Sequence, residues 1–340
     1  MTDKAIIQIN KLDFIWPTLD PFLFCVHHED FYPQGNAEFG PKSSLKGRTI
    51  GQDFAIKDGW RMYHGDKVPG FPAHPHRGFE TITVVRKGTI DHADSMGAAG
   101  RYGGGDTQWM TAGKGVQHSE MFPLLNQDQD NPAELFQIWL NLPGSKKMVE
   151  PHFTMFWKDK TPTVHLKDNA GKTIDIDIIA GAIDDISALT PPPDSWASDQ
   201  NNKVAVWVIK MEAGANWTLP AEDRGLNRSL YFYKGSSINI SASDLLPMTS
   251  VDLKSDIAVP ITSGAEDSYI LLLQGQPIGE PIAHHGPFVM NTRQELEQAF
   301  RDYQTTQFGG WPWPDKDQVH PPTRGRFAKY KDGHEELPEK

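Results

Sequence analysis

Two short strings hold the residues of this sequence that could do metal chemistry, His74-Pro75-His76 and His118-Ser119-Glu120. Each string places two metal-capable side chains at positions i and i+2. On a β-strand such residues point to the same face, so each string would aim both side chains at one point. Two such strands side by side would bring three imidazoles and one carboxylate together. This set suits Fe(II), Mn, Ni, Cu or Zn and argues against a thiolate site.

These strings supply only four protein ligands, so a metal that prefers five or six would keep open positions. Open positions are typical of a catalytic centre rather than a closed structural one. A divalent ion with three neutral imidazoles and one carboxylate carries about +1 net charge, which lowers the pKa of a bound enol. Glu120 is the candidate catalytic residue, because from its position beside the metal it could take the proton that the enol releases.

The elements that must position these side chains have the pattern of β-strands. Their apolar runs are short, rich in Val, Ile, Phe and Trp, and separated by Gly, Pro, Asn and Asp. The run Ile174-Asp175-Ile176-Asp177-Ile178 alternates apolar and acidic residues, as in a strand with one exposed face. Strands are predicted at residues 81–85, 135–142, 174–179, 204–209, 230–233 and 269–273. We therefore expect an all-β, mostly antiparallel fold, built as a sandwich or barrel.

One helix is predicted near the C-terminus. Thr292 and Glu295 stand three residues apart, as a capping box requires, and an apolar stripe follows at helical spacing: Leu296, Ala299, Phe300 and Tyr303. This stripe should pack on one of the β domains. Beyond residue 308, the string Trp311-Pro312-Trp313-Pro314 and the charged residues after it predict extended chain lying on the surface, with disorder in the last residues.

Composition bounds the functional class. A chain of 340 residues corresponds to roughly two domains, and 38% hydrophobic content is enough for a core in each. With 33 basic and 44 acidic residues the net charge is -11, which makes direct binding to nucleic acid unfavourable. A single cysteine, Cys25, fits a reducing compartment, and no signal peptide or membrane span is predicted. We expect a soluble cytoplasmic protein.

Several longer strings resemble the pirin family, a branch of the cupins built from two tandem β-barrels. The resemblance rests on FPAHPHRGFET at 71–81 and GDTQWMTAGKGVQHSE at 105–120, with FQIWLNLP at 136–143 and GPFVMNT at 286–292. It spans roughly residues 21–308 with gaps. It implies two cupin (jelly-roll) barrels with a C-terminal helix: an N-terminal metal-binding domain at 1–155, a second cupin domain without metal at 156–308 that ends in the helix, and an extended tail at 309–340.

The resemblance also implies a ligand set. In pirins the metal, usually iron, lies in the N-terminal barrel and is held by two His of one string and the His and Glu of the other. The matching positions here are His74, His76, His118 and Glu120. The implied cofactor is a mononuclear divalent metal, first of all Fe(II), with Mn, Ni, Cu or Zn as alternatives.

Two classes of function follow. Some bacterial pirin-like proteins cleave flavonols with dioxygen as quercetin 2,3-dioxygenases, which implies a flavonol and dioxygen as substrates, with release of carbon monoxide. Eukaryotic members are described as nuclear transcription cofactors that sense the redox state of iron. The alternative is therefore a non-catalytic, iron-binding, redox-responsive regulator that acts through a protein partner. A vestigial cupin is disfavoured by the intact ligand set.

Some positions carry more modest expectations. Residues 42–70 make a longer connection than expected of a pirin, and such an insertion could border the mouth of the first barrel. The aromatic and Met residues near the ligand strings could line a pocket for an aromatic substrate, although most should be core: Phe71, Phe79, Trp109, Met110 and Met121. Glu80 is expected to make a structural hydrogen bond. The remaining histidine strings are expected on surfaces or loops: His27-His28, His64, His165 and His284-His285.

Overall fold

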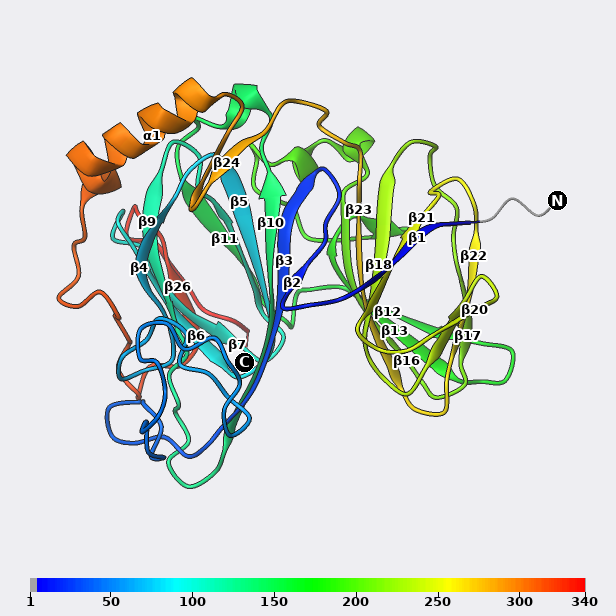
Figure 1. Ribbon diagram of the computed structural model, residues 1–340, viewed down its shortest axis with the longest axis horizontal. Coiled ribbons are helices and arrows are strands. Elements are labelled where there is room, and N and C mark those ends of the chain that lie inside the picture. Colours follow the sequence, from blue (N-terminus) through cyan, green and yellow to red (C-terminus); the bar gives the residue numbers. More distant parts are fainter. Residues whose placement is uncertain (1–4, 340) are drawn as a thin grey trace. The chain divides into compact units, whose positions relative to one another are not determined.

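The computed structural model describes residues 5–339, and strands dominate this part of the chain (Figure 1). The six predicted strands are confirmed, with ends that differ by a few residues. Contacts group the chain into two compact units. Within the described residues, 26–159 and 280–339 form one, which we call the histidine unit, and 5–25 and 160–279 form the other, which we call the second unit.

The histidine unit contains two antiparallel sheets, ordered β11-β8-β5-β10-β3 and β27-β26-β7-β6-β9-β4. Aromatic and aliphatic side chains from both sheets form its core. The strands are β3 (Phe22–Tyr32), β4 (Gly70–His76), β5 (Phe79–Lys87), β6 (Thr89–Asp94), β7 (Ala99–Gly103), β8 (Thr107–Thr111), β9 (Val116–Met121), β10 (Asn131–Asn141), β11 (His152–Phe156), β26 (Phe327–Lys329) and β27 (Glu335–Glu336), with the short hairpin β24 (Ala283–His285) and β25 (Phe288–Met290) and the 3₁₀ turns η1 (Gly144–Lys146) and η4 (Gln307–Gly309).

Helix α1 (Arg293–Thr306) belongs to the histidine unit. Its capping box is present, because Thr292 and Glu295 each accept a hydrogen bond from the backbone of the other. Its apolar stripe packs on Phe288 and Met290 of β25, and Asp302 forms an ion pair of 2.7 Å with Arg77. The predicted domains differ from this grouping. The helix, predicted in the second domain, and the tail, predicted as a separate segment, both group with the histidines.

The tail has more regular structure than the predicted extended chain on the surface. Strand β26 pairs with β7, and Phe327 and Ala328 are buried. Arg101, which is buried, donates to both carboxylate oxygens of Asp91 at 2.6 and 2.7 Å. The same guanidinium donates to tail carbonyls, those of His320, Pro321 and Arg324. The tail is therefore anchored in the unit by a buried cation that sequence patterns do not reveal.

Replacing Arg101 by Met should release the tail. The change leaves the Asp91 carboxylate buried without its partner, and removal of one member of a buried ion pair costs about 3–5 kcal/mol. We expect a fall of that size in the free energy of unfolding, measured by urea denaturation, together with early proteolysis after residue 309. Arg293→Met, on the exposed face of α1, is the matched control. Unchanged stability would show that Arg101 does not anchor the tail.

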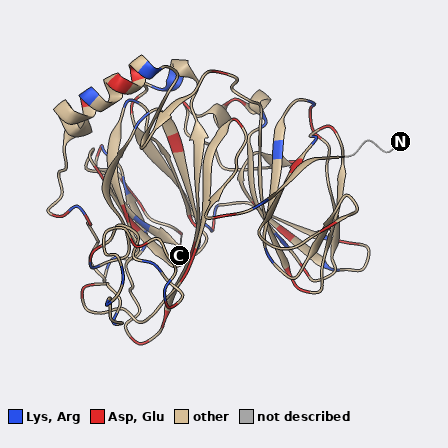
Figure 2. Cartoon of the chain, in the orientation of Figure 1, with Lys and Arg blue, Asp and Glu red and all other residues tan. Residues whose placement is uncertain are grey.

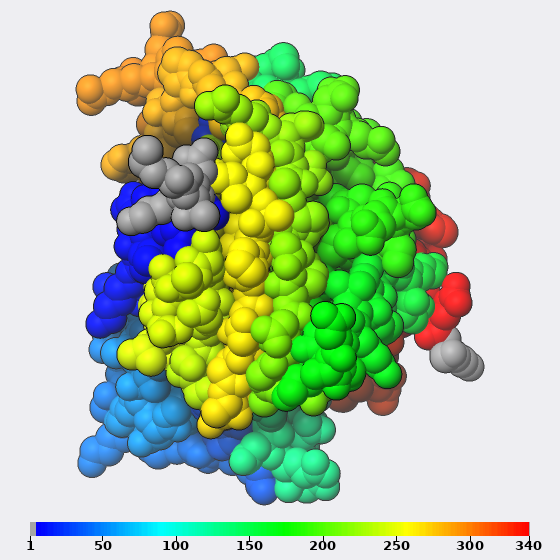
Figure 3. Space-filling view, turned by 90° about the vertical axis from the view of Figure 1, so that its right-hand side faces the viewer, coloured from blue at the N-terminus to red at the C-terminus, as the bar shows by residue number. Residues whose placement is uncertain are grey.

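The second unit is also built from antiparallel sheets, ordered β1-β21-β18-β23-β16-β13-β12 and β17-β22-β19-β20. Figure 3 shows green and yellow segments, distant in sequence, lying side by side. Its strands enclose one apolar core. They are β1 (Ile6–Lys11), β2 (Ile15–Trp16), β12 (Thr163–Lys167), β13 (Thr173–Ala180), β14 (Ala182–Ile183), β15 (Ile186–Ser187), β16 (Ala205–Met211), β17 (Asn216–Leu219), β18 (Asn227–Lys234), β19 (Ile238–Ile240), β20 (Ser243–Leu245), β21 (Thr249–Leu253), β22 (Val259–Ser263) and β23 (Ser268–Gly275), with 3₁₀ turns η2 (Trp196–Ser198) and η3 (Gln200–Asn202).

Charged residues occur mainly in loops and in α1, and most strand segments are coloured as uncharged (Figure 2). No helix in the described part of the chain is long and apolar enough to cross a membrane. The single cysteine, Cys25, is buried.

Candidate metal centre

Three histidine rings come together where β4 and β9 pair. The strands are antiparallel, with His74 opposite His118. The ring centroids of His74 and His118 are 4.5 Å apart, those of His74 and His76 are 4.8 Å apart, and those of His76 and His118 are 5.0 Å apart. One nitrogen from each ring lies within 4.8 Å of the others. The predicted convergence of the two histidine strings is therefore observed.

Glu120 points to the same cluster. Its Oε2 is 3.8 Å from Nε2 of His118. Its Oε1 accepts a hydrogen bond of 3.0 Å from the hydroxyl of Thr83, and its Oε2 accepts one of 3.3 Å from the amide of Gln137. The carboxylate is thus held beside the rings by donors from other strands.

The ring nitrogens have the pattern that metal ligands need. Both nitrogens of His118 and Nδ1 of His76 are buried without a hydrogen-bond partner among residues 5–339. Nδ1 of His74 donates to the Pro72 carbonyl at 3.0 Å, which leaves Nε2 as the ligating atom. A buried polar atom left unpaired costs about 1–3 kcal/mol. Nitrogens bound at about 2.0–2.1 Å to one tetrahedral ion lie about 3.4 Å apart, so these nitrogens, within 4.8 Å of one another, need to close in only slightly to share an ion. The residues therefore fit a bound divalent ion.

Burial sets the protonation of the cluster. It lowers the pKa of His74 to about 4 and the pKa values of His76 and His118 well below the ordinary value. The rings are therefore neutral, the form that binds metals. Burial raises the pKa of Glu120, while the charge of His92 and the hydrogen bonds to the carboxylate act in the opposite direction. A cation at this point would favour the ionised carboxylate.

Several neighbours of the cluster were not singled out from the sequence. They are Thr83, His92, Tyr102, Gln137 and Trp139. His92 is fully buried on β6, opposite Glu120, and its ring centroid is 5.6 Å from that of His118. Gln137 and Trp139 are two residues apart on β10, so their alternation could have shown that they share a face.

The cluster is reachable from one side. His118 is fully buried, whereas His74, Gln137 and Trp139 are only partly buried. The rings of Phe71 and Trp139 contact those of His74 and His76, with centroids 6.3 and 5.4 Å apart. Phe79 contacts His76 and is fully buried, as are three further predicted core residues, Trp109, Met110 and Met121. Half-buried aromatic rings thus border the accessible side.

Other predicted roles have mixed outcomes. Glu80 accepts a hydrogen bond of 2.7 Å from the Thr111 hydroxyl, so the predicted structural hydrogen bond is confirmed. The prediction of a surface or loop position is wrong for His28, which is 5% exposed in β3 because it packs on Tyr63 and donates to its hydroxyl at 2.8 Å. His64 and His284 are exposed.

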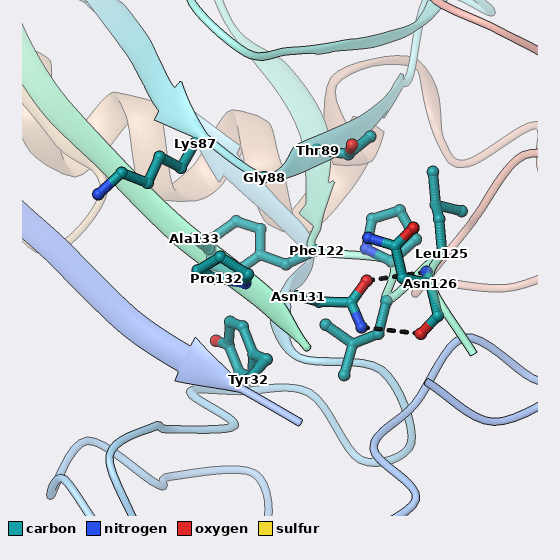
Figure 4. A pocket seen from close by; sticks show the side chains of 12 residues that line it. Tyr32, Lys87, Gly88, Thr89, Phe122, Leu125, Asn126, Asn131, Pro132 and Ala133 are labelled. Atoms are coloured by element: carbon teal, nitrogen blue, oxygen red, sulfur yellow. Dashed lines mark hydrogen bonds between the residues drawn. The ribbon is translucent and has the colours of Figure 1, made fainter. Parts of the chain in front are cut away.

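A pocket of about 330 Å³ lies beyond the end of β9 (Figure 4). Tyr32, Phe122 and Ala133 contribute to its walls. The amide of Asn131 donates to the backbone oxygens of Pro33 and Asn126 and accepts from the backbone of Asn126. Because this amide is saturated within the protein and no histidine of the cluster lines the pocket, the pocket is separate from the candidate centre.

Comparison with known proteins is decisive for the family. Residues 18–140 match the family described as Pirin, and residues 206–309 match the Pirin C-terminal cupin domain. A pirin-like protein of Caulobacter vibrioides is 37% identical over 243 residues, which are 72% of this chain and 82% of that protein. The chain belongs to the pirin family. The predicted pair of cupin barrels with a C-terminal helix is thereby confirmed.

Other relatives of this pirin carry two kinds of name. A Pseudomonas aeruginosa protein provisionally named a quercetin 2,3-dioxygenase is 34% identical over 70% of this chain and 79% of its own. Human Pirin is 31% identical over 73% of this chain and 80% of its own. A crystal structure of a quercetin 2,3-dioxygenase from Acinetobacter baumannii aligns with a TM-score of 0.71 at 25% identity, covering 90% of this chain and 99% of that one.

Proposed function

We propose that this pirin is a metal-dependent dioxygenase that opens the central ring of flavonols. The ligands would be His74, His76, His118 and Glu120, around Fe(II) first of all, with Mn, Ni, Cu or Zn as alternatives. The observation that carries the proposal is the set of buried, unpartnered imidazole nitrogens beside a carboxylate that other strands hold in place. Relatives named for quercetin cleavage support it.

A bound divalent ion would supply a Lewis acid that lowers the pKa of the flavonol 3-hydroxyl. Glu120 would accept that proton. Thr83 and Gln137 would hold the carboxylate in position as it does so. In the overall reaction both atoms of dioxygen enter the ring-opened ester, and the carbon that bears the 3-hydroxyl leaves with its own oxygen as carbon monoxide.

The surroundings favour an aromatic substrate. Phe71 and Trp139 are partly buried and flank the rings of His74 and His76. Aromatic rings stack in offset or edge-to-face geometry with centroids about 4.5–7 Å apart, which suits a flat polycyclic ligand. Gln137, on the same face of β10 as Trp139, adds a polar group to this side of the site.

Anaerobic loading with each metal tests the proposal. Quercetin is added, oxygen is admitted, and flavonol absorbance and carbon monoxide are followed. We expect turnover by the native protein, its loss in His74→Ala and Glu120→Ala, and its retention in the control His165→Ala, whose ring is exposed in the second unit. Full metal uptake without turnover of quercetin or related flavonols would overturn the proposal and favour a redox-responsive regulator that acts through a protein partner.

A further inference from the structure

An arm of aromatic rings leads from the surface to His74. It consists of Phe54, His64 and Phe71, and we call it the aromatic arm. The ring centroids of Phe54 and His64 are 4.9 Å apart, those of His64 and Phe71 are 5.8 Å apart, and those of Phe71 and His74 are 6.3 Å apart. Phe54 and His64 are exposed, whereas Phe71 is half-buried. The arm therefore continues from solvent to the edge of the candidate centre.

The connection that bears the arm contains no regular strand but is cross-linked by internal contacts. Arg48 pairs with Asp53 at 2.9 Å, and its guanidinium lies 3.3 Å from the centroid of the Trp60 ring. The backbones of Asp53 and Tyr63 exchange two hydrogen bonds, of 2.8 and 3.0 Å. These contacts close residues 53–63 into a loop, with Phe54 directly after Asp53 and His64 directly after Tyr63. The backbone N–H of His64 also donates to the Gly70 carbonyl at 3.1 Å. Little conformational freedom would be lost when a ligand packs against Phe54 and His64.

The hydrogen bonding of His64 decides its chemistry. Nδ1 of its ring is 2.7 Å from the carbonyl oxygen of Gly51. A carbonyl can only accept, so Nδ1 carries the proton and, in the neutral ring, Nε2 is left as an acceptor. A fixed, exposed acceptor beside two phenyl rings is suited to an aromatic ring that carries hydroxyl groups.

We propose that the aromatic arm is a specificity element that binds a hydroxylated outer ring of the substrate. Phe54 and Phe71 would pack against that ring, and Nε2 of His64 would accept a hydrogen bond from a phenolic hydroxyl. Phe71 contacts both His64 and His74, so a substrate held at the candidate centre would reach His64 along the ring of Phe71. The inference rests on the proposed function, and it narrows the substrate class to flavonols with a hydroxylated outer ring.

Binding to the zinc-loaded protein without oxygen tests the arm independently of turnover. The probes are quercetin, whose outer ring carries hydroxyls, and 3-hydroxyflavone, whose outer ring carries none, both titrated by absorbance. His64→Phe should raise the Kd of quercetin about 5- to 10-fold. The same variant should leave the Kd of 3-hydroxyflavone within about twofold, since no hydrogen bond to that ligand is lost. His64→Gln, which keeps an acceptor, should restore part of the loss.

Two further variants separate packing from hydrogen bonding. Phe54→Ala should weaken both ligands by a similar factor, because it removes a ring contact that both make. His165→Phe, at an exposed histidine of the second unit, should change neither Kd. Metal content should equal that of the native protein in all variants, because none of these side chains is a proposed ligand.

The possible results test the specificity role of the aromatic arm separately from the dioxygenase activity. In turnover with the active metal, His64→Phe should raise the KM of quercetin with kcat unchanged. An equal effect of His64→Phe on the Kd of both ligands, or no effect on either, would overturn the proposed role of the arm even if the native protein cleaves quercetin. Selective weakening without any turnover would support the arm and refute the dioxygenase. Absence of binding of either flavonol to the native protein would overturn both.

Discussion

Replacing His118 by Leu is expected to abolish metal binding while leaving the metal-free protein at least as stable as the native one. Both ring nitrogens of His118 are buried without a partner within the described chain. In the absence of metal, such atoms destabilise the folded state by about 1–3 kcal/mol each. Leucine has a similar volume and no polar atom, so it removes this penalty. The histidine is therefore best explained by a ligand that compensates it.

Chemical unfolding with and without Zn(II) measures both effects. For the native protein, zinc at about 100 times its Kd should add about 2.7 kcal/mol to the free energy of unfolding. The same zinc should add nothing to His118→Leu, and competition with a chelator should show a larger loss of affinity than the roughly 10- to 100-fold caused by changes in outer partners. His165→Leu is the control. A large destabilisation of metal-free His118→Leu would mean that the imidazole has a structural role.

The convergence of the histidines could be predicted from sequence because it depends on local alternation. Residues at i and i+2 share a face of any strand, so the common direction of each pair of side chains follows once its own segment is a strand. The prediction also assumed that the two strands lie side by side. The antiparallel pairing of β4 and β9, with His74 opposite His118, agrees with this assumption.

The support of Glu120 could not be predicted in the same way. Thr83 lies on β5 and Gln137 on β10, and both meet the carboxylate only through the packing of separate strands. Their side-chain types are common. Alternation along β10 indicates that Gln137 and Trp139 share a face, but not that this face meets Glu120. Residues that hold a ligand from a distance in sequence become visible only when register and sheet order are known.

Long-range packing also determines the unit against which the helix and the tail lie. The capping box and the apolar stripe predicted α1 from residues that are close together in the sequence, but the unit against which the stripe packs depends on β25 and Arg77. The tail reaches the neighbours of the candidate ligands. The backbone of Ala73 donates to Lys316 at 2.8 Å, and the amide of Gln117 donates to Gln307 at 2.6 Å. The strands that bear the histidines are therefore positioned partly by the C-terminal residues.

Glu120→Gln is expected to separate metal binding from turnover. Glutamine has nearly the same shape as glutamate, and three imidazoles remain to hold the ion, so metal should still bind at raised concentration. The amide cannot take the flavonol proton. Loss of a general base lowers rates about 10²- to 10⁴-fold, and we expect kcat for quercetin to fall in that range at full metal occupancy. Zinc-loaded, oxygen-free Glu120→Gln should still bind quercetin.

Thr83→Val serves as the companion variant, because it removes one hydrogen bond to the carboxylate and keeps the carboxylate itself. It should lower kcat less than Glu120→Gln does, since the carboxylate remains and Gln137 still donates to its Oε2, although Gln137 loses the Thr83 hydroxyl as a partner of its own Oε1. Metal content, quercetin affinity and carbon monoxide release are measured on the same preparations. If Glu120→Gln at full occupancy turned over quercetin as fast as the native protein, Glu120 would neither take the proton nor be a necessary ligand. The chemistry would then have to depend on the three histidines alone.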